Sequence, residues 1–439
     1  MHKPEPIVII GAGWAGLAAA IELSHNKVPV TLIESNQQLG GRGRTISINH
    51  RETDNGQHLL IGAYSETLRL LKLMGHHESD LFKRRPTLLK CRTHKLPGFR
   101  LSLPHMPAPI HFIVGLLIAN GFSLIEKKNI IQLCITLRLI NFSIKKDEPL
   151  LSWLKNNKQS EKIIAQFWQP LCLSILNTSA DRASCQVFLH VLKDSFTLQR
   201  HYSDFLFARH NIGKLFPEPA KNYLNGAGVK ILTRERVKKL ERIDNGRFAI
   251  QLRDKTINTK RVILAVPPKQ CLNLTQHIST LKSLHEKLAR FKTSPITTVY
   301  CSYPKHISLG QDMIGISGGE LDWLIDRSSS NQPGVIAAII SGDGPHMQLS
   351  KESLADKVTK EIATLYPHWP KPINVSVIRE KHATFLCEVG INSYRPENKT
   401  ALSNMWLAGD YTNTGYPATL EGAVRSGVNC TKSILKTLS

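Results

Sequence analysis

Residues 6 to 34, PIVIIGAGWAGLAAAIELSHNKVPVTLIE, hold the pattern that decides the fold of this chain. The β-branched run over residues 7 to 10 predicts a buried strand, the alanine-rich run over residues 15 to 23 predicts a helix, and residues 28 to 33 predict a second strand. A strand, a helix and a strand in this order are typical of a parallel sheet that carries helices on its faces.

Three glycines in G-x-G-x-x-G spacing connect the first strand to the helix. Gly11 permits the tight turn, Gly13 lets a pyrophosphate approach the backbone, and Gly16 lets helix and strand pack closely. The unpaired N–H groups at the start of the helix attract phosphates. Glu34 ends the second strand, where its carboxylate can accept hydrogen bonds from a ribose diol. The stretch predicts a dinucleotide site; the alternative is a plain strand-helix-strand unit whose glycines serve packing alone.

A second glycine motif follows that glutamate. Gly40 and Gly41 let the backbone lie against a ligand, and Arg42 is close enough to the dinucleotide turn to pair with a phosphate. A turn-rich loop over residues 54 to 58 comes next. His58, at its end, is either a surface or packing histidine or a neighbour of the cofactor.

Length and composition narrow the class of protein. With 439 residues, 41% of them hydrophobic, the chain is long enough for two or three packed domains. The eight cysteines include no C-x-x-C pair, which argues against a redox dithiol, a zinc ribbon and a disulfide scaffold, and we expect no metal site. The first apolar run is only four residues long, so we expect no signal peptide and a cytoplasmic protein.

The formal net charge of +23 is the unusual feature of the composition. Nucleic acid, an anionic membrane surface or an acidic substrate can each explain such a charge. The basic residues lie in short groups, for example residues 83 to 85, and no run of five and no zinc-finger or RNP-type signature is present. We favour a basic face that touches anionic lipid and expect no nucleic-acid partner.

Two apolar runs, residues 110 to 125 and 130 to 144, lie in the second quarter of the chain. Polar residues interrupt both runs, so neither is long enough for a membrane-spanning helix. Two interpretations stay open: core helices of a substrate domain, or a surface that dips into a membrane. Lysines at positions 127, 128, 145 and 146 flank the runs, as expected of an apolar mouth with a basic rim.

Residues 405 to 423, MWLAGDYTNTGYPATLEGA, are the second informative stretch. A short apolar strand ends at Gly409 and Asp410, and a loop then leads to a helix that begins near Thr419. Asp410, at the carboxyl end of a strand, suits a ribityl hydroxyl or a pyrophosphate-bound water. The N–H groups of the helix can face the pyrimidine carbonyl of a flavin, where negative charge gathers on reduction.

Together, the two ends of the chain resemble the flavin amine oxidase and phytoene desaturase superfamily, in which these motifs clasp one FAD. Further stretches, DNGQHLLIGAY, FWQPLCLSILNT, ASCQVFLHVLKDS, LFPEPA and AGDYTNTGYPATLEGAVRSG, resemble the hydroxysqualene dehydroxylase family of the bacterial squalene and hopanoid pathway. The resemblance implies an α/β fold of the amine-oxidase type. In it a Rossmann-like FAD-binding domain with a doubly wound parallel sheet carries an inserted α+β substrate domain.

The same resemblance implies the domain boundaries and the contacts of FAD. Residues 1–85, 205–284 and 396–439 would form the FAD-binding domain, and residues 86–204, largely helical, and 285–395 would form the substrate domain. The implied cofactor-binding residues are Gly11, Gly13, Trp14, Ala15, Gly16, Glu34, Ser35, Gly40, Gly41, Arg42, Gly56, Gln57, His58, Val237, Gly409, Asp410, Thr419, Leu420 and Ala423.

The implied reaction is the reductive dehydroxylation of hydroxysqualene by reduced FAD, which gives squalene, oxidised FAD and water. The allylic carbinol loses water to leave a delocalised cation, and a dry pocket protects this cation while a hydride quenches it. The alternative enzyme is a carotenoid or phytoene-type desaturase. The alternative of another class is a non-catalytic basic protein on a FAD fold that binds lipid or nucleic acid.

The corresponding lysine of amine oxidases, which lies beside the flavin, has no match in residues 294 to 297, although Lys292 is near. Amine oxidation is therefore not expected.

The acid that protonates the leaving hydroxyl is left open by the sequence. His58, Tyr411, Tyr416 and Glu421 are candidates because they lie near the cofactor motifs, but Glu421 can instead contact the flavin or cap its helix, and the tyrosines can pack the ring. There is no second G-x-G-x-x-G, so we expect the electron donor to be a separate partner. We also expect a peripheral protein on the inner face of the cytoplasmic membrane, beside the synthase that makes the long apolar substrate.

Overall fold

The structure of the protein, a computed structural model, describes residues 5–48, 51–93, 98–243 and 246–438. A five-stranded sheet near the two chain ends has the order β10-β2-β1-β14-β20, and all of its pairs are parallel. Its strands are β1 (Ile7–Ile10), β2 (Val30–Ile33), β10 (Lys230–Leu232), β14 (Val262–Leu264) and β20 (Met405–Leu407).

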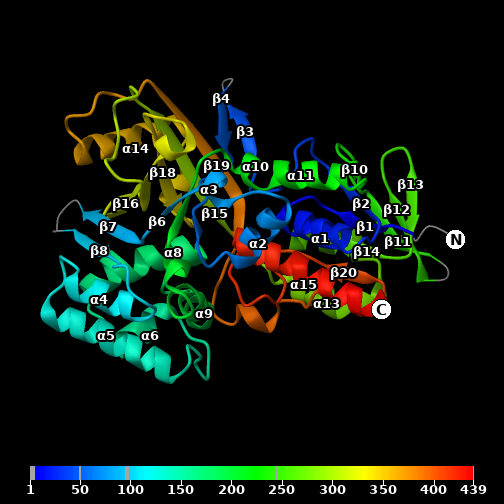
Figure 1. The fold of residues 1–439 in the computed structure, drawn as a ribbon, viewed down its shortest axis with the longest axis horizontal. Coiled ribbons are helices and arrows are strands. Elements are labelled where there is room, and N and C mark those ends of the chain that lie inside the picture. Colours follow the sequence, from blue (N-terminus) through cyan, green and yellow to red (C-terminus); the bar gives the residue numbers. More distant parts are fainter. Residues whose placement is uncertain (1–4, 49–50, 94–97, 244–245, 439) are drawn as a thin grey trace.

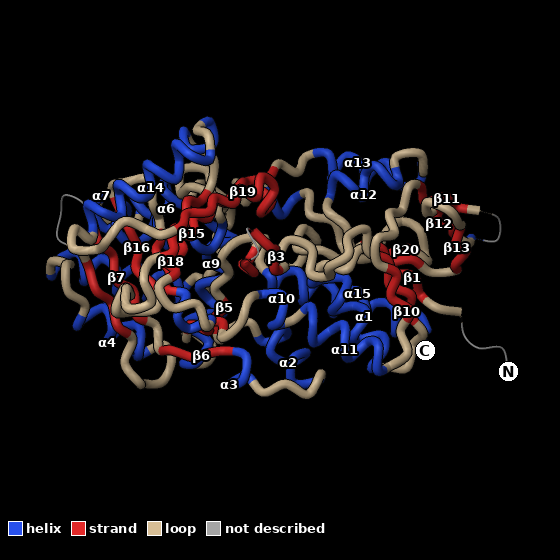
Figure 2. Tube along the Cα trace, turned by 90° about the horizontal axis from the view of Figure 1, so that it is seen from above, coloured by secondary structure: helices blue, strands red, loops and turns tan. Residues whose placement is uncertain are grey.

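Helices cover both faces of this sheet, so its strands are apolar on both sides. Ile7 and Ile9 pack on one face and Val8 and Ile10 on the other, and all four are buried. Figure 2 shows α12 and α13 on one side of the sheet and α1, α11 and α15 on the other. The helices are α1 (Trp14–His25), α11 (Pro217–Gly226), α12 (Pro268–Thr275), α13 (Lys282–Ala289) and α15 (Leu420–Leu438). A small antiparallel sheet beside them consists of β11 (Lys239–Arg242), β12 (Phe248–Gln251) and β13 (Thr256–Thr259). The predicted α/β fold with a parallel sheet is confirmed.

A seven-stranded mixed sheet forms the other half of the molecule (Figure 1). Residues of α14 (Lys351–Leu365) pack on one of its faces, and helices from the middle of the chain pack toward the other. In spatial order its strands are β19 (Asn374–Phe385), β15 (Thr293–Ser302), β18 (Val335–Ser341), β17 (Trp323–Asp326), β16 (Met313–Ser317), β7 (Leu88–Thr93) and β8 (Phe99–Ser102).

The helical layer does not follow the two apolar runs of the sequence. A break falls inside the first run, because Gly121 has a φ of +90° and Ser123 begins the next helix with a capping box. The second run belongs largely to that next helix. The helices of this layer are α4 (Ile110–Ile118), α5 (Leu124–Leu139), α6 (Leu150–Asn156), α7 (Glu161–Ile163), α8 (Gln169–Leu176) and α9 (Cys185–Phe196). Within the described residues, none of the helices combines the length and apolarity needed to span a bilayer.

Short elements join the two halves. They are β3 (Thr45–Ile48), β4 (Arg51–Asp54), β5 (Leu60–Ile61), β6 (Phe82–Arg85), β9 (Phe205–Ala208), α2 (Ser65–Leu73), α3 (Glu78–Leu81) and α10 (Ile212–Leu215). The parallel sheet thus draws its strands from the three segments that were assigned to the FAD-binding domain, while the boundaries themselves stay a prediction.

Candidate functional site

A cavity of about 680 Å³ extends from the carboxyl ends of β1 and β2 to strands β16, β17 and β18 and helices α8 and α9. It therefore runs from one half of the molecule into the other. All of the predicted cofactor-binding residues except Gly16 line it. Both informative stretches of the sequence face the same space.

The first glycine turn has two kinds of glycine. At Gly11 the φ is +103°, and an added Cβ would lie 2.4 Å from the carbonyl oxygen of Ala265, so the backbone conformation requires glycine. At Gly16 an added Cβ would lie 2.0 Å from the carbonyl oxygen of Gly11. Gly16 therefore serves the packing of α1 on β1 and does not line the cavity, which corrects its assignment as a direct cofactor contact.

Gly13 and Gly56 behave differently, because they face the cavity. An added Cβ at Gly13 would come no closer than 3.9 Å to another residue, and one at Gly56 would meet no atom within 4 Å. Both glycines line the cavity, so a side chain there would fill the space of a ligand instead of striking the protein. No side chain caps α1 at Gly13 either. Open space and an uncapped helix start fit a pyrophosphate.

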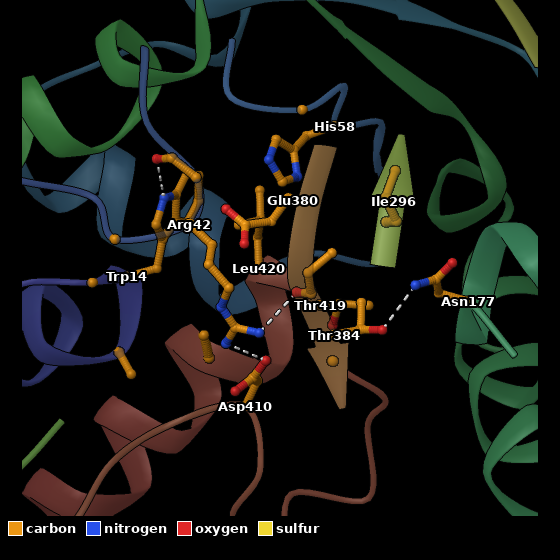
Figure 3. Close-up of a pocket in the computed structure, with 18 of the residues that line it drawn as sticks. Trp14, Arg42, His58, Asn177, Ile296, Glu380, Thr384, Asp410, Thr419 and Leu420 are labelled. Atoms are coloured by element: carbon orange, nitrogen blue, oxygen red, sulfur yellow. Dashed lines mark hydrogen bonds and ion pairs between the residues drawn. The ribbon is translucent and has the colours of Figure 1, made fainter. Parts of the chain in front are cut away.

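Arg42 joins the two ends of the chain. Its guanidinium donates to Asp410 Oδ2 over 2.6 Å and to the carbonyl oxygen of Ala383 over 2.8 Å (Figure 3). The loop that carries it is held to the first turn by a bond from Gly40 N to the carbonyl oxygen of Ala12, 2.8 Å long. The expected pairing of Arg42 with a phosphate thus has a competitor in Asp410.

Glu34 is buried at the end of β2 and lines the cavity. Its Oε2 accepts from the backbone N–H of Ala12 over 2.8 Å and its Oε1 from that of Asn36 over 2.9 Å. The Ser35 hydroxyl and Asn36 Nδ2 also donate to Oε1, each over 3.1 Å, so the capacity left for a ribose hydroxyl lies at Oε2, which has one partner. The placement fits the predicted role.

Arg327, which no motif of the sequence marks, holds the loop over residues 54 to 58. It is 1% exposed, pairs with Asp54 over 2.9 Å and donates to Gln57 Oε1 and to Asn211 Oδ1, each over 2.8 Å. With Gln332, whose Oε1 accepts from Arg327 Nε over 3.1 Å, this buried arginine has four partners and fixes the backbone beside it. Gly56 to His58 are in this way held against the cavity.

Glu421 is not a proton donor in this site. It is fully buried and does not line the cavity; its carboxylate accepts the N–H groups of Glu66 and Thr67 at the start of α2, each over 3.0 Å. The Thr67 hydroxyl at 2.7 Å and Arg425 at 2.8 Å complete its partners. Glu421 therefore caps α2 instead of its own helix, which corrects its place among the catalytic candidates.

The other three candidates line the cavity but are poorly placed as acids. Burial, together with the Arg42 and Arg327 guanidiniums, lowers the pKa of His58 to about 4, so the imidazole is neutral at physiological pH. Burial raises the pKa of Tyr411 far above its usual value, and its hydroxyl lies beside the Cys271 thiol in the core.

Tyr416, the last of the three, already has a partner for its proton. Its hydroxyl donates to Asp194 Oδ2, and burial raises its pKa. The phenol proton of Tyr416 is therefore already used in a hydrogen bond to the Asp194 carboxylate.

Glu380 is a carboxylate at the cavity that the sequence did not reveal. It lies on β19, opposite Ile296 of β15, and its Oε2 accepts from Asn55 Nδ2 over 2.8 Å. Figure 3 shows its carboxylate beside the Arg42 side chain and below the His58 ring. No local sequence pattern marks Glu380. It reaches the cavity because β19 pairs with β15, where its partner Ile296 lies 84 residues earlier in the chain.

Asn177 ties the helical wall to the sheet. It ends α8 in the left-handed conformation with a φ of 47°, and its Nδ2 donates to the carbonyl oxygen of Pro295 over 3.1 Å and to Thr384 Oγ1 over 3.0 Å. Its Oδ1 accepts from Gly342 N over 2.9 Å. One side chain thereby joins α8 to strands β15 and β19 and to the residue that follows β18.

The far arm of the cavity is apolar. Its lining comes from β7, α8, α9, β9 and the strands β16, β17 and β18. Its large apolar residues are Leu89, Leu171, Ile175, Val191, Phe196, Phe205, Met313, Trp323, Ile325 and Ile339. No lysine lines the cavity within the described part of the chain, and Lys292 is an exposed residue that pairs with Glu388 over 3.5 Å. Such an arm suits a long hydrocarbon better than an amine.

The comparisons with known proteins agree with this geometry. The family model for flavin containing amine oxidoreductase matches residues 14–435. The hydroxysqualene dehydroxylase of Zymomonas mobilis is 26% identical over 434 residues, which cover 95% of this chain and 96% of that protein. The zeta-carotene desaturase of Zea mays is 22% identical over 97% of this chain and 84% of that protein. Cyclohexylamine oxidase from Brevibacterium oxydans superposes with a TM-score of 0.74 at 14% identity, over 99% of this chain and 100% of that one.

The family match covers nearly the whole chain, and the cavity has the glycines, the acidic strand end and the uncapped helix that FAD requires. The expectation of an enzyme is confirmed, and the non-catalytic alternative is not retained. The chain belongs to the flavin containing amine oxidoreductase family and is an FAD-dependent oxidoreductase.

Proposed function

We propose that this enzyme converts hydroxysqualene to squalene. The observation that carries the proposal is the single cavity, in which the predicted flavin-binding residues continue into an apolar arm without a lysine among the described residues. The similarity to a hydroxysqualene dehydroxylase over 95% of the chain supports it. In the reaction a C–O bond breaks, a C–H bond forms, and the hydroxyl leaves as water after taking up one proton.

The chain offers a place for each part of FAD. The start of α1 and Gly13 would hold the pyrophosphate, Glu34 the ribose and the backbone at Val237 the adenine. Asp410, with Arg42, would meet the ribityl chain, and the loop over residues 56 to 58 with Thr419 and Leu420 would hold the ring. Reduced FAD, once bound, supplies the hydride.

The apolar arm would bind the isoprenoid chain and exclude water. A delocalised allylic cation survives only where no water attacks it, and the aliphatic and aromatic lining provides such a surface. The aromatic faces of Trp323 and Phe205 can also stabilise positive charge.

Glu380 would protonate the leaving hydroxyl from its carboxyl group. Among the described carboxylates that line the cavity, Asp410 pairs with Arg42, Glu235 with Lys255 and Asp194 with Tyr416, while backbone N–H groups hold Glu34. Glu380 accepts from the neutral amide of Asn55 over 2.8 Å and from the backbone N–H of His382 over 3.3 Å. Asn55 would be a positioning residue.

The experiment is a single-turnover assay without oxygen. The FAD-loaded enzyme is reduced with dithionite and mixed with hydroxysqualene in detergent, and the products are identified by mass spectrometry. We expect squalene in an amount equal to the flavin that becomes oxidised. Unchanged hydroxysqualene would overturn the proposal, and dehydrogenation of a carotene by the oxidised enzyme would favour the desaturase function suggested by the relative from Zea mays.

A further inference from the structure

The outer side of α4 and α5 exposes large apolar side chains. Leu124 is 86% exposed and Leu139 is 81% exposed. Monomeric proteins rarely leave such a surface open unless it has a partner. We call this surface the α4–α5 face; its exposed apolar members are Ile110, Leu117, Ile118, Leu124, Ile125, Ile135 and Leu139.

The end of α4 lies next to the start of α5. Lys127 Nζ donates to the carbonyl oxygen of Leu117 over 2.7 Å, which joins the end of α4 to the start of α5. Figure 1 shows α4 and α5 at the border of the molecule, at the opposite end from both termini. The face is therefore free to meet an extended flat partner.

The charge around the face is positive. Between residues 106 and 146 the basic residues are Lys127, Lys128, Arg138, Lys145 and Lys146, and the acidic residue is Glu126. Glu126 is turned inward, because its carboxylate accepts from Ser123 N over 2.8 Å and from the Ser160 hydroxyl over 3.0 Å. Apolar residues with a basic surround match the interface of an anionic bilayer.

The inner side of α4 lies against the walls of the cavity. The Phe112 ring packs on Phe196 with centroids 4.8 Å apart, and His111 Nε2 lies 3.2 Å from the Ser203 hydroxyl. Phe196 and Ser203 both line the cavity. One helix thus separates the apolar arm from the exposed face.

We propose that the α4–α5 face docks on an anionic lipid bilayer and presents the apolar arm of the cavity to it. The helices lie in the interface and do not cross the bilayer. The docking does not depend on the proposed function. The further claim that docking delivers a lipid-dissolved substrate rests on the proposed function.

Sedimentation with vesicles tests the docking. The FAD-loaded enzyme is mixed with phosphatidylcholine vesicles that contain or lack phosphatidylglycerol. We expect the wild type to sediment with the anionic vesicles and the double variant Leu124→Glu/Leu139→Glu to lose roughly tenfold or more of this partition. Ile373→Glu is the matched control, because Ile373 is 70% exposed and lies elsewhere, before β19.

A second pair of variants tests the charges. Lys128→Gln/Arg138→Gln should weaken binding to anionic vesicles and leave the weak binding to neutral vesicles unchanged. A wild type that stays in the supernatant with anionic vesicles would overturn the proposal, as would an equal loss in Ile373→Glu. A dimer in solution that Leu124→Glu/Leu139→Glu dissolves, without vesicle binding, would show that a second copy covers the face and would also overturn it.

Activity separates this proposal from the proposed function. With hydroxysqualene in detergent the Leu124→Glu/Leu139→Glu variant should keep the turnover of the wild type, and with hydroxysqualene in anionic vesicles it should lose it. Failure to form squalene in detergent would refute the proposed reaction and leave the sedimentation result standing.

Discussion

The two ends of the cavity are built in opposite ways. The dinucleotide end is made by backbone at glycine turns and by a few polar side chains with specific partners, such as Arg42 with Asp410. The apolar arm is made by side chains from strands and helices that lie far apart in the sequence, and it contains few polar atoms. The dinucleotide end is therefore suited to bind one ligand specifically. The apolar arm excludes water and places few specific demands on the hydrocarbon that it binds.

This contrast suggests where change is tolerated. Substitutions among apolar residues of similar size in the arm should alter which hydrocarbon fits. Any added atom at the dinucleotide end should lower the affinity for FAD. The proposed reaction would take place at the junction, where Glu380 of β19 and the loop over residues 56 to 58 lie near each other.

The largest effect is expected at that junction. Glu380→Gln keeps the bond capacity toward Asn55 but cannot supply the proton, so squalene formation should fall about a hundredfold or more with FAD content unchanged. Glu286→Gln on α13, exposed and far from the cavity lining, is the matched control. Normal turnover in Glu380→Gln would remove the assigned proton donor.

The next effect separates stability from chemistry. Glu421→Ala leaves the start of α2 without its cap and Arg425 without its carboxylate partner, so the free energy of unfolding should fall by about 3 kcal/mol. Urea unfolding measures it. Glu66→Ala, which removes a solvent-accessible pair with Arg69 on the same helix, should cost under about 1 kcal/mol. Turnover per bound flavin should stay the same in Glu421→Ala; its loss would return Glu421 to the catalytic candidates.

A smaller effect tests the dinucleotide end. Gly13→Ala places a methyl group in the cavity without touching the protein. The Kd for FAD should therefore rise roughly tenfold, while the stability of the apoprotein stays the same. Gly226→Ala is the control, because its added Cβ meets no atom within 4 Å and Gly226 does not line the cavity. Titration with FAD measures both. Unchanged affinity in Gly13→Ala would place the pyrophosphate elsewhere.

The smallest effect concerns His58. Its pKa is about 4 in the folded protein against 6.5 ordinarily, so the unfolded chain binds the extra proton between these values, and stability falls as the pH drops through this interval. Between pH 7 and pH 5 the Tm of His58→Gln should therefore fall by a few degrees less than the Tm of the wild type. His25→Gln, exposed at the end of α1, should follow the wild type. Parallel curves for His58→Gln and wild type would contradict the lowered pKa of His58.

The cofactor end could be predicted from the sequence because its signals are local. The turn at Gly11, the strand end at Glu34 and the corner at Gly409 and Asp410 each follow from residues a few positions apart. Their meeting in one cavity needed the resemblance of the whole chain. The catalytic candidates stay a prediction, because closeness to a motif in sequence does not fix where a side chain points: Glu421, for example, turns toward α2.

The residues that were missed have long-range partners. Glu380 reaches the cavity through the register of β15 and β19, and Arg327 through its pairing with Asp54. The break between α4 and α5 was signalled by Gly121 and by the capping box at Ser123, but the apolar character on both sides hid it.

Asn177 has a consequence for how a bulky chain enters. Its amide fastens the end of α8 to the carbonyl oxygen of Pro295, to Thr384 and to Gly342, and both Asn177 and Thr384 line the cavity. We therefore expect this part of the cavity wall to keep its shape when a long guest binds. The guest would then have to fit past Asn177 lengthwise, and the depth that its leading end reaches would set the position of its reacting carbon.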